Sequence, residues 1–255
     1  MNSRELNFLA DLIEAERLPW PPDTQQLRSS GIAGDYEDCC QLLAGALAVG
    51  STSLSSAWML RQIAKERAKG EAIEGAIQPV ISGPCSVLGM RGTEDAFRDI
   101  IDHATNSILI TGFALHNGPS VLAHLAQRMD ARPALDVVLC LDVSRLPGDT
   151  SDSQAIIAAF TTRFRQAEWP GRRAPRLFYD PRSLARGVEE RSALHAKIVI
   201  ADSSWALVGS ANLTEAALKR NIEIGVMVSL PAFAGRLRGH VEALIHNGIL
   251  VPVPL

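Results

Sequence analysis

From residue 93 onward, the sequence alternates between amphipathic stretches and short apolar runs, and this alternation limits the possible folds more than any other feature. Helical periodicity occurs over four ranges, 93–105, 120–130, 152–167 and 231–246. Runs of aliphatic and β-branched residues predict strands over 107–115, 135–143, 176–179, 193–201, 205–208 and 221–229. Thr93 stands where it could cap the first helix. The alternation is typical of an α/β fold whose mixed, mostly parallel sheet is flanked by helices.

The first part of the chain has a different pattern. Apolar residues recur at helical spacing over 7–18, 38–48 and 54–68, and prolines directly after Leu18 end the first of these helices. Between Gly70 and Gly92 there are five glycines and two prolines, with little periodicity, which predicts a boundary. We therefore expect a small helical N-terminal region at residues 1–78 and an α/β domain at residues 79–255.

One stretch of the N-terminal region, from Cys39 to Leu60, contains no charged residue. A membrane span is one interpretation, but the stretch also holds Gln41, two glycines and five Ser or Thr residues. A spanning helix needs about 20 predominantly apolar residues. A buried helical hairpin is therefore favoured, and no membrane association is expected.

Composition narrows the class of protein. The formal charge is −3, about −4 in the N-terminal region and +1 in the remainder, which argues against a generally basic nucleic-acid binder. Four cysteines, of which Cys39 and Cys40 are adjacent, make no disulfide framework and indicate a reducing compartment. The N-terminus lacks the pattern of a secretory signal. Together these features predict a cytoplasmic protein.

The most informative segment contains His195 and Lys197, and Lys197 is one of only four lysines. On a strand, a period of two places both side chains on one face, so that a phosphate could sit between imidazole and ammonium. Gly209 would let the backbone approach a ligand closely. Ser210 and Asn212 add short polar groups before a helical turn predicted at 213–218, whose N–H groups would face an anion.

The pattern His195-x-Lys197-x4-Asp202-x6-Gly209-Ser210-x-Asn212 resembles the signature of the phospholipase D superfamily at each specified position. The resemblance covers roughly residues 85–250 and implies a phospholipase D-like catalytic lobe. It implies a metal-independent phosphodiesterase without cofactors, in which His195 forms a phosphohistidine. Lys197 and Asn212 would hold the phosphate oxygens.

The resemblance also assigns roles to residues around this pair. Glu223 would accept a hydrogen bond from the second ring nitrogen of His195 and so fix its tautomer, while Asp202 and Ser210 would support the turn and the residues that surround the site. The motif occurs once, which implies a homodimer whose two copies share one active site. His116 follows the strand at 107–115, at the carboxyl end where open sheets place ligands, and could line the site. Taken singly, each of these residues could equally belong to a turn or a solvated strand face.

The substrate is less constrained than the reaction. Eight arginines and four acidic residues lie from Arg163 to Arg191. Because the guanidinium group binds phosphate well, this segment favours a nuclease that acts on DNA or RNA, and DNA is the favoured substrate of the two. A solvated loop is the ordinary explanation of the same segment. A phospholipase or phosphatidyl transferase is the alternative, and a non-catalytic scaffold of a defence complex is the second. The layout of a helical region before one lobe resembles the phospholipase D-like components (DrmC) of bacterial DISARM anti-phage systems, which implies an antiviral role and defence-system partner proteins.

Overall fold

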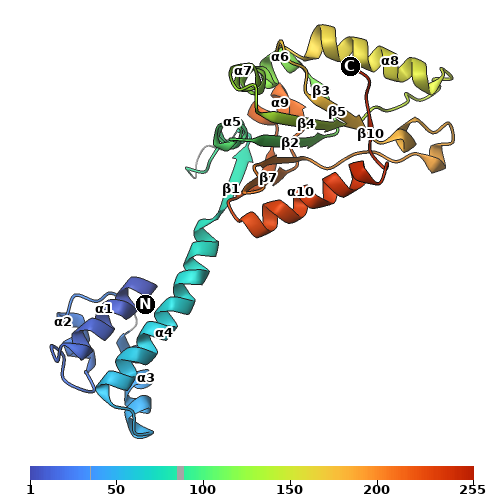
Figure 1. Cartoon of the computed structure of the whole chain (residues 1–255). Helices are drawn as coiled ribbons and strands as arrows, with labels where there is room; N and C mark the ends of the chain where they lie inside the picture. The colour runs from blue at the N-terminus through green and yellow to red at the C-terminus, as the bar shows by residue number, and fades with distance from the viewer. Residues whose placement is uncertain (35, 85–88) are drawn as a thin grey trace. The chain divides into compact units, whose positions relative to one another are not determined.

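The computed structural model describes residues 1–34, 36–84 and 89–255 of the chain. It divides into two compact units, Met1–Gly75 and Ala76–Leu255 (Figure 1). The division lies just before strand β1 (Ile77–Ser82), so the boundary expected after residue 78 falls inside that strand. β1 escaped the sequence analysis because Pro79 interrupts its apolar pattern, yet the strand pairs along its whole length with a neighbour in the second unit.

The first unit consists of four helices, α1 (Ser3–Glu14), α2 (Thr24–Ser29), α3 (Tyr36–Ala48) and α4 (Ser53–Gly75). α1 begins four residues before the predicted helix because Asn2 and Glu5 form a reciprocal capping box. Leu9, Leu27 and Leu43, all fully buried or nearly so, belong to a core made from this unit alone.

The uncharged stretch from Cys39 to Leu60 forms most of α3 and the start of α4, as predicted, but it is not buried throughout. Cys39, Leu43 and Leu60 are in the core, whereas Val49 and Trp58 are 83% and 64% exposed. The expectation of a buried hairpin is therefore only partly correct, since the connection between the helices faces solvent. Among the described residues, no helix combines the length and apolar character needed to span a membrane.

The second unit is built on a mixed sheet of eight strands in the order β1-β9-β7-β6-β2-β4-β5-β10. The remaining strands of this sheet are β2 (Ser107–Gly112), β4 (Asp136–Leu141), β5 (Arg176–Tyr179), β6 (Ile198–Ala201), β7 (Trp205–Gly209), β9 (Glu223–Val228) and β10 (Val251–Pro252). A separate pair joins β3 (Leu115–His116) to β8 (Leu213–Thr214) in parallel.

The expected mixed α/β sheet is confirmed, but its parallel part is smaller than expected. Only β2–β4 and β4–β5 pair in parallel among the described strands of this sheet. β6 and β7 are joined by a turn of three residues, Asp202 to Ser204, and so short a connection can only make antiparallel neighbours. Parallel pairing needs a longer crossover, which the helices between β2 and β4 provide.

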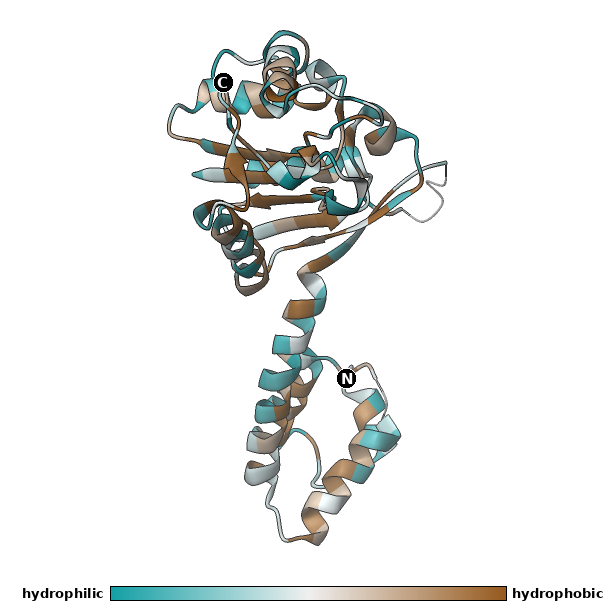
Figure 2. Cartoon of the chain, turned by 90° about the vertical axis from the view of Figure 1, so that its right-hand side faces the viewer, coloured by the Kyte–Doolittle hydropathy of each residue, from teal (hydrophilic) through white to brown (hydrophobic). Residues whose placement is uncertain are grey.

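Helices cover both faces of the sheet (Figures 1 and 2). They are α5 (Thr93–His103), α6 (Gly118–Val121), α7 (Ala123–Ala131), α8 (Ser153–Arg163), α9 (Glu215–Lys219) and α10 (Pro231–His246). A π-helical turn, Phe164–Glu168, extends α8, and short 3-10 turns occupy Pro181–Leu184 and Val188–Glu190. Thr93 was expected to cap α5, but it does not. Gly92 is the capping residue, and Thr93 is buried in the first turn.

Alternation along the central strands supplies two cores. Ile108 and Ile110 of β2 join α5 and α7 in the larger core, while Leu109 between them faces α10. β6 repeats the pattern, with Val199 in the larger core and Ile200 against α10. Because both faces are covered, the edges formed by the strand ends are where polar chemistry can reach solvent.

Candidate active site

One edge of the sheet gathers the residues singled out in the sequence. β6 runs antiparallel to β2 and β7, so its start lies beside the ends of both. The end of β7 in turn lies beside the start of β9, where Gly209 pairs with Gly225. His195 and Lys197 before β6, Ser210 after β7 and Glu223 at the start of β9 therefore belong to the same edge.

His195 and Lys197 precede the strand that was expected to carry them. β6 begins at Ile198, five residues later than predicted. The hydroxyl of Thr111 on β2 explains the difference, because it donates to the carbonyl of Ala196 (2.9 Å) and accepts from the N–H of Ile198 (3.2 Å). A side chain thus replaces the backbone ladder at this point.

The two basic side chains nevertheless meet. Lys197 Nζ lies 3.2 Å from His195 Nδ1 and donates to the backbone carbonyl of His195 at 2.8 Å. The ring of Phe113, just after β2, lies 4.7 Å from the imidazole between centroids, and Lys197 Nζ lies 5.7 Å from the Phe113 centroid. His195 is exposed and Lys197 is half-buried. Imidazole and ammonium are therefore presented together at the surface, as the motif predicts.

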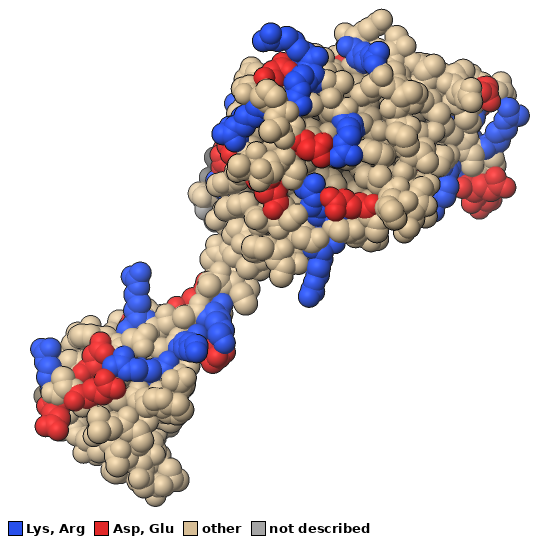
Figure 3. Space-filling model, viewed as in Figure 1, with Lys and Arg blue, Asp and Glu red and all other residues tan. Residues whose placement is uncertain are grey.

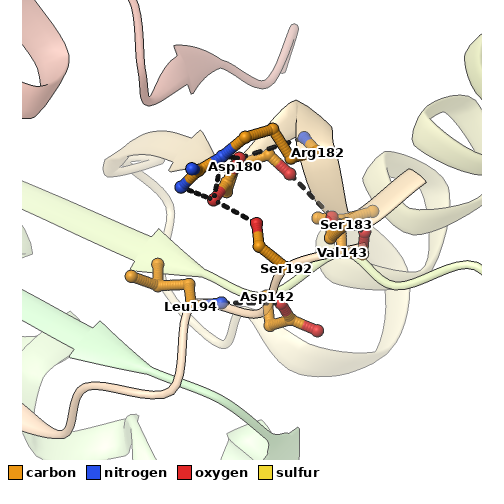
Figure 4. Close-up of polar contacts among 7 residues, drawn as sticks. All are labelled: Asp142, Val143, Asp180, Arg182, Ser183, Ser192 and Leu194. Atoms are coloured by element: carbon orange, nitrogen blue, oxygen red, sulfur yellow. Dashed lines mark hydrogen bonds and ion pairs between the residues drawn. The ribbon is translucent and has the colours of Figure 1, made fainter. Parts of the chain in front are cut away.

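Two carboxylates that the sequence analysis missed hold the segment leading to His195 (Figure 4). Asp142, after β4, accepts the N–H of Leu194 at 3.1 Å. Asp180, after β5, accepts the hydroxyl of Ser192 at 2.9 Å and also pairs with Arg182 at 2.7 Å. Both residues follow strands whose carboxyl ends lie at this edge. His116 was selected because open sheets bind ligands at such ends, and the same rule could have found these two carboxylates.

The surroundings of Lys197 affect its ionisation. A small cavity of about 40 Å³ beneath it is lined by Lys197, Thr111, Ser210 and Glu223 together with apolar side chains. Burial lowers the pKa of Lys197, and the nearby charge of Glu223 opposes this shift in part. The ammonium is therefore easier to deprotonate than that of an ordinary lysine.

Glu223 does not bond to His195, which corrects the expected orienting role. Its carboxylate accepts the hydroxyl of Ser210 and the amide of Asn221 at 3.3 Å. Ser210 also accepts the N–H of Ile224 at 3.2 Å, so this hydroxyl connects the end of β7 to β9. Among the described residues, the His195 ring lies within hydrogen-bond distance of Lys197 Nζ and in contact with the Phe113 ring.

Gly209 lies close to the neighbouring strand, which gives it a role besides the expected approach of a ligand. A Cβ on Gly209 would lie 3.2 Å from Gly225 Cα and from the carbonyl of Ile224. The two glycines face one another across β7 and β9, and the strands approach closely there. Gly209 still lines the cavity under Lys197, so the close packing brings β9 and Glu223 toward the lysine.

Asn212 was expected to precede a helical turn directly, but no helix begins there. The chain continues through β8 into the five-residue helix α9, whose cap is Thr214, bonded to the N–H of Ala217 at 3.1 Å. The side-chain Oδ1 of Asn212 is buried and has no hydrogen-bond partner within the described structure. An unpaired buried amide oxygen is unfavourable, and the expected contact with phosphate oxygens would have to come from the N–H groups of the same side chain.

Asp202 lies at the other end of β6 and serves the fold there. Its carboxylate accepts the N–H groups of Thr105 (2.5 Å), Asn106 (2.8 Å) and Ser107 (2.7 Å). Burial opposes ionisation, but these donors outweigh it and hold the pKa of Asp202 below its usual value. Asp202 therefore fixes the loop before β2, which agrees with a supporting role and not with contact to substrate.

His116 lies on β3, where it pairs with Thr214, and lines a separate hollow with Asn117, Glu168 and Arg220. It does not line the cavity beneath Lys197. His116 does lie at the edge where the parallel strands have their carboxyl ends. That position alone does not predict which loops at this edge turn toward His195 and Lys197.

The arginine-rich segment is less available to a ligand than its composition suggested. Arg173 donates to the carbonyls of Met129 and Arg132, and Arg176 pairs with Asp136 at 2.5 Å. Arg182 and Arg191 also have partners within the protein. Basic and acidic side chains are interspersed over the face shown in Figure 3. Arg163 is exposed, with its guanidinium 5.5 Å from the centroid of the Phe160 ring.

Within residues 1–34, 36–84 and 89–255, no group of three or more His, Cys, Asp and Glu side chains is arranged to hold a metal ion.

Comparison with known proteins agrees with the motif and the fold. A family model described as "Cardiolipin synthase, PLD-like domain" matches residues 97–245, which is more than half of the chain. The chain belongs to this phospholipase D-like family. The resemblance expected from the residues around His195 is therefore confirmed.

Individual relatives are more distant. The DISARM protein DrmC of Bacillus paralicheniformis is 28% identical over 156 residues, which span 61% of this chain and 58% of that protein. The phospholipase D family member Nuc of Salmonella typhimurium is 20% identical, with a TM-score of 0.43 over 69% of this chain and 96% of its own. NucT of Helicobacter pylori is 11% identical, with a TM-score of 0.43 over 69% and 99%.

Proposed function

We propose that this protein hydrolyses phosphodiester bonds of nucleic acid through a covalent intermediate on His195, and that DNA rather than RNA is its substrate. The observation that carries the proposal is the pairing of His195 and Lys197, with Nζ 3.2 Å from Nδ1, at an exposed edge of the sheet. A phosphate placed there meets a nucleophilic ring and a cation at once. Family membership supports the reaction class, and it leaves the substrate to experiment.

In the proposed reaction, a ring nitrogen of His195 attacks phosphorus and the bond to the leaving oxygen breaks. A second histidine donates a proton to that oxygen. Water then attacks the phosphohistidine, gives a proton to the second histidine, and the phosphorus–nitrogen bond breaks. Lys197 and Asn212 would stabilise the charge on the non-bridging oxygens. Since the motif occurs once, the second histidine would be His195 of a second copy in a homodimer.

The proposed biological setting comes from one relative. The relative named DISARM protein DrmC shares 28% identity, and it favours a role in anti-phage defence beside other proteins of such a system. The exposed guanidinium of Arg163 supports a polyanionic nucleic-acid substrate, and the cysteine content of the sequence supports a reaction in the cytoplasm.

The chemistry is tested by incubating the protein with DNA and RNA in EDTA and mapping phosphorylated histidine by mass spectrometry. We expect cleavage and a phosphate on His195, both lost in His195→Ala, because no other group supplies the nucleophile. His240→Ala, which removes an exposed histidine from α10, is the matched control and should retain activity. Head-group release from liposomes without cutting of nucleic acid would contradict the proposed substrate. Absence of turnover with either would contradict the catalytic role.

A further inference from the structure

A third hollow, of about 570 Å³, opens at the same edge of the sheet as His195. It lies where β2 and β4 end and is closed on its far side by α8. Leu141, Val143 and Ile156 give it apolar walls. Asp142, which already accepts the Ser144 hydroxyl, and Asp149, which accepts the N–H of Ser151, add carboxylate oxygens with further lone pairs. The motif residues do not line it, so the phosphate chemistry alone does not account for it.

Phe113 connects this hollow to the catalytic pair. Its ring lines the hollow and also lies 4.7 Å from the His195 ring, tilted by 51°. The side chain is 36% exposed, although a phenylalanine at the end of a central strand would ordinarily be buried. A phosphate held by His195 and Lys197 would thus have an open aromatic surface immediately beside it.

The charges around the hollow suit a nucleotide. Lys197 lies on one side of Phe113, and Arg163 lines the hollow at α8, so cations border it at two places. Between them are an aromatic ring, aliphatic walls and carboxylate oxygens. A base has a flat face that stacks on an aromatic ring and amino groups that donate to carboxylates. An acyl chain would leave Asp142 and Asp149 facing hydrocarbon, which is unfavourable.

We propose that this hollow binds an unpaired base next to the scissile phosphate, stacked on Phe113, so that the substrate is single-stranded or locally unpaired nucleic acid. A base within a duplex is stacked on both faces and would have to leave the helix to reach the ring. The inference rests on the proposed function, and it adds the class of substrate and a residue that selects it.

The test measures binding, so that it does not depend on turnover. Fluorescence anisotropy compares a short single-stranded oligonucleotide with an all-abasic strand of the same length, which carries the same phosphates. We expect about tenfold tighter binding of the strand with bases, as one aromatic stacking contact provides. Phe113→Ala should reduce this ratio below about twofold, and Phe113→Tyr should restore it, since the ring is retained.

Phe233→Ala is the matched control, because Phe233 is 40% exposed on α10 and distant in sequence from the hollow; it should leave the ratio unchanged. Equal binding of the two strands, tighter binding of a duplex, or an unaltered ratio in a folded Phe113→Ala protein would overturn the inference. Tighter binding of a short-chain phospholipid than of the oligonucleotide would overturn it as well. Cleavage of methyl 4-nitrophenyl phosphate, which has no base, reports separately on the proposed chemistry.

Discussion

At the scale of single residues, we expect the protonation of Lys197 to set the alkaline limit of activity. Burial lowers its pKa, and the protonated form is the one that can hold a phosphate oxygen. Activity should therefore fall as pH rises through this lowered pKa, earlier than for an ordinary lysine near 10.4. We expect kcat/KM to show this alkaline decline, and Lys197→Arg to move it to higher pH while lowering the maximum at least tenfold, because guanidinium geometry differs.

The assignment can be checked directly because the chain has only four lysines. After reductive methylation with a carbon-13 label, the four side chains should give separable resonances. The one that is lost in Lys197→Met should titrate below the pH at which a free, equally methylated lysine does. A Lys197 resonance that titrates at or above the pH of the free methylated lysine would contradict the proposed effect of burial.

At the scale of elements, Asp202 shows that a motif residue can serve the fold instead of the chemistry. Its carboxylate fixes three N–H groups of the loop between α5 and β2, and its φ of 49° is one that asparagine tolerates well. Asp202→Asn should therefore lower the free energy of unfolding by at most about 2 kcal/mol, since the carboxylate is partly exposed. Because the pKa is depressed in the folded state, this stability is present at neutral pH and is lost as pH falls through the lowered pKa.

Urea unfolding at several pH values measures this difference. The gap between the wild type and Asp202→Asn should be largest at neutral pH and should close in acid. At 20 °C the variant should keep its kcat/KM within about twofold, because Asp202 lies at the opposite end of β6 from Lys197. A large loss of activity without loss of stability would instead favour direct participation of Asp202 in the reaction.

At the scale of the whole molecule, the number of chains per active site is the main question. The motif supplies one histidine where the proposed reaction uses two, so the site would be complete only in a dimer. Adding an equal amount of His195→Ala protein and allowing subunits to exchange should lower wild-type activity to about half, because mixed dimers lack one histidine. A fourfold excess should leave about a fifth.

Analytical ultracentrifugation over the same concentrations checks the oligomeric state. Activity per chain should fall as the dimer dissociates, nearly tenfold for a tenfold dilution once monomers dominate. An active monomer, or wild-type activity unchanged by excess His195→Ala protein, would contradict the shared site. His240→Ala added in the same proportion is the control for nonspecific effects of mixing.

Much of the fold was accessible from the sequence because periodicity is local. The helix at 231–246 and the strand at 176–179 have the predicted bounds, since a proline or a change of period marks their ends. The strand at 193–201 was predicted too long, because the hydroxyl of Thr111, far away in the sequence, replaces its first ladder contacts. Helix α1 was predicted too late, since a capping box and not apolar spacing begins it.

The family could be recognised from the sequence, because the spacing of His195, Lys197, Gly209 and Asn212 is a covalent property of the chain. Which other residues surround them depends on the folded chain. Phe113, after β2, contacts the His195 ring, while Asp142 and Asp180, after β4 and β5, bond to Leu194 and Ser192 just before it. β2 lies beside β6 and is followed by β4 and β5 in the sheet, and no local pattern in the sequence records that order. In the folded chain Glu223 accepts a hydrogen bond from Ser210 and none from His195. Ser210 and Glu223 are near each other because β7 and β9 approach closely where Gly209 faces Gly225.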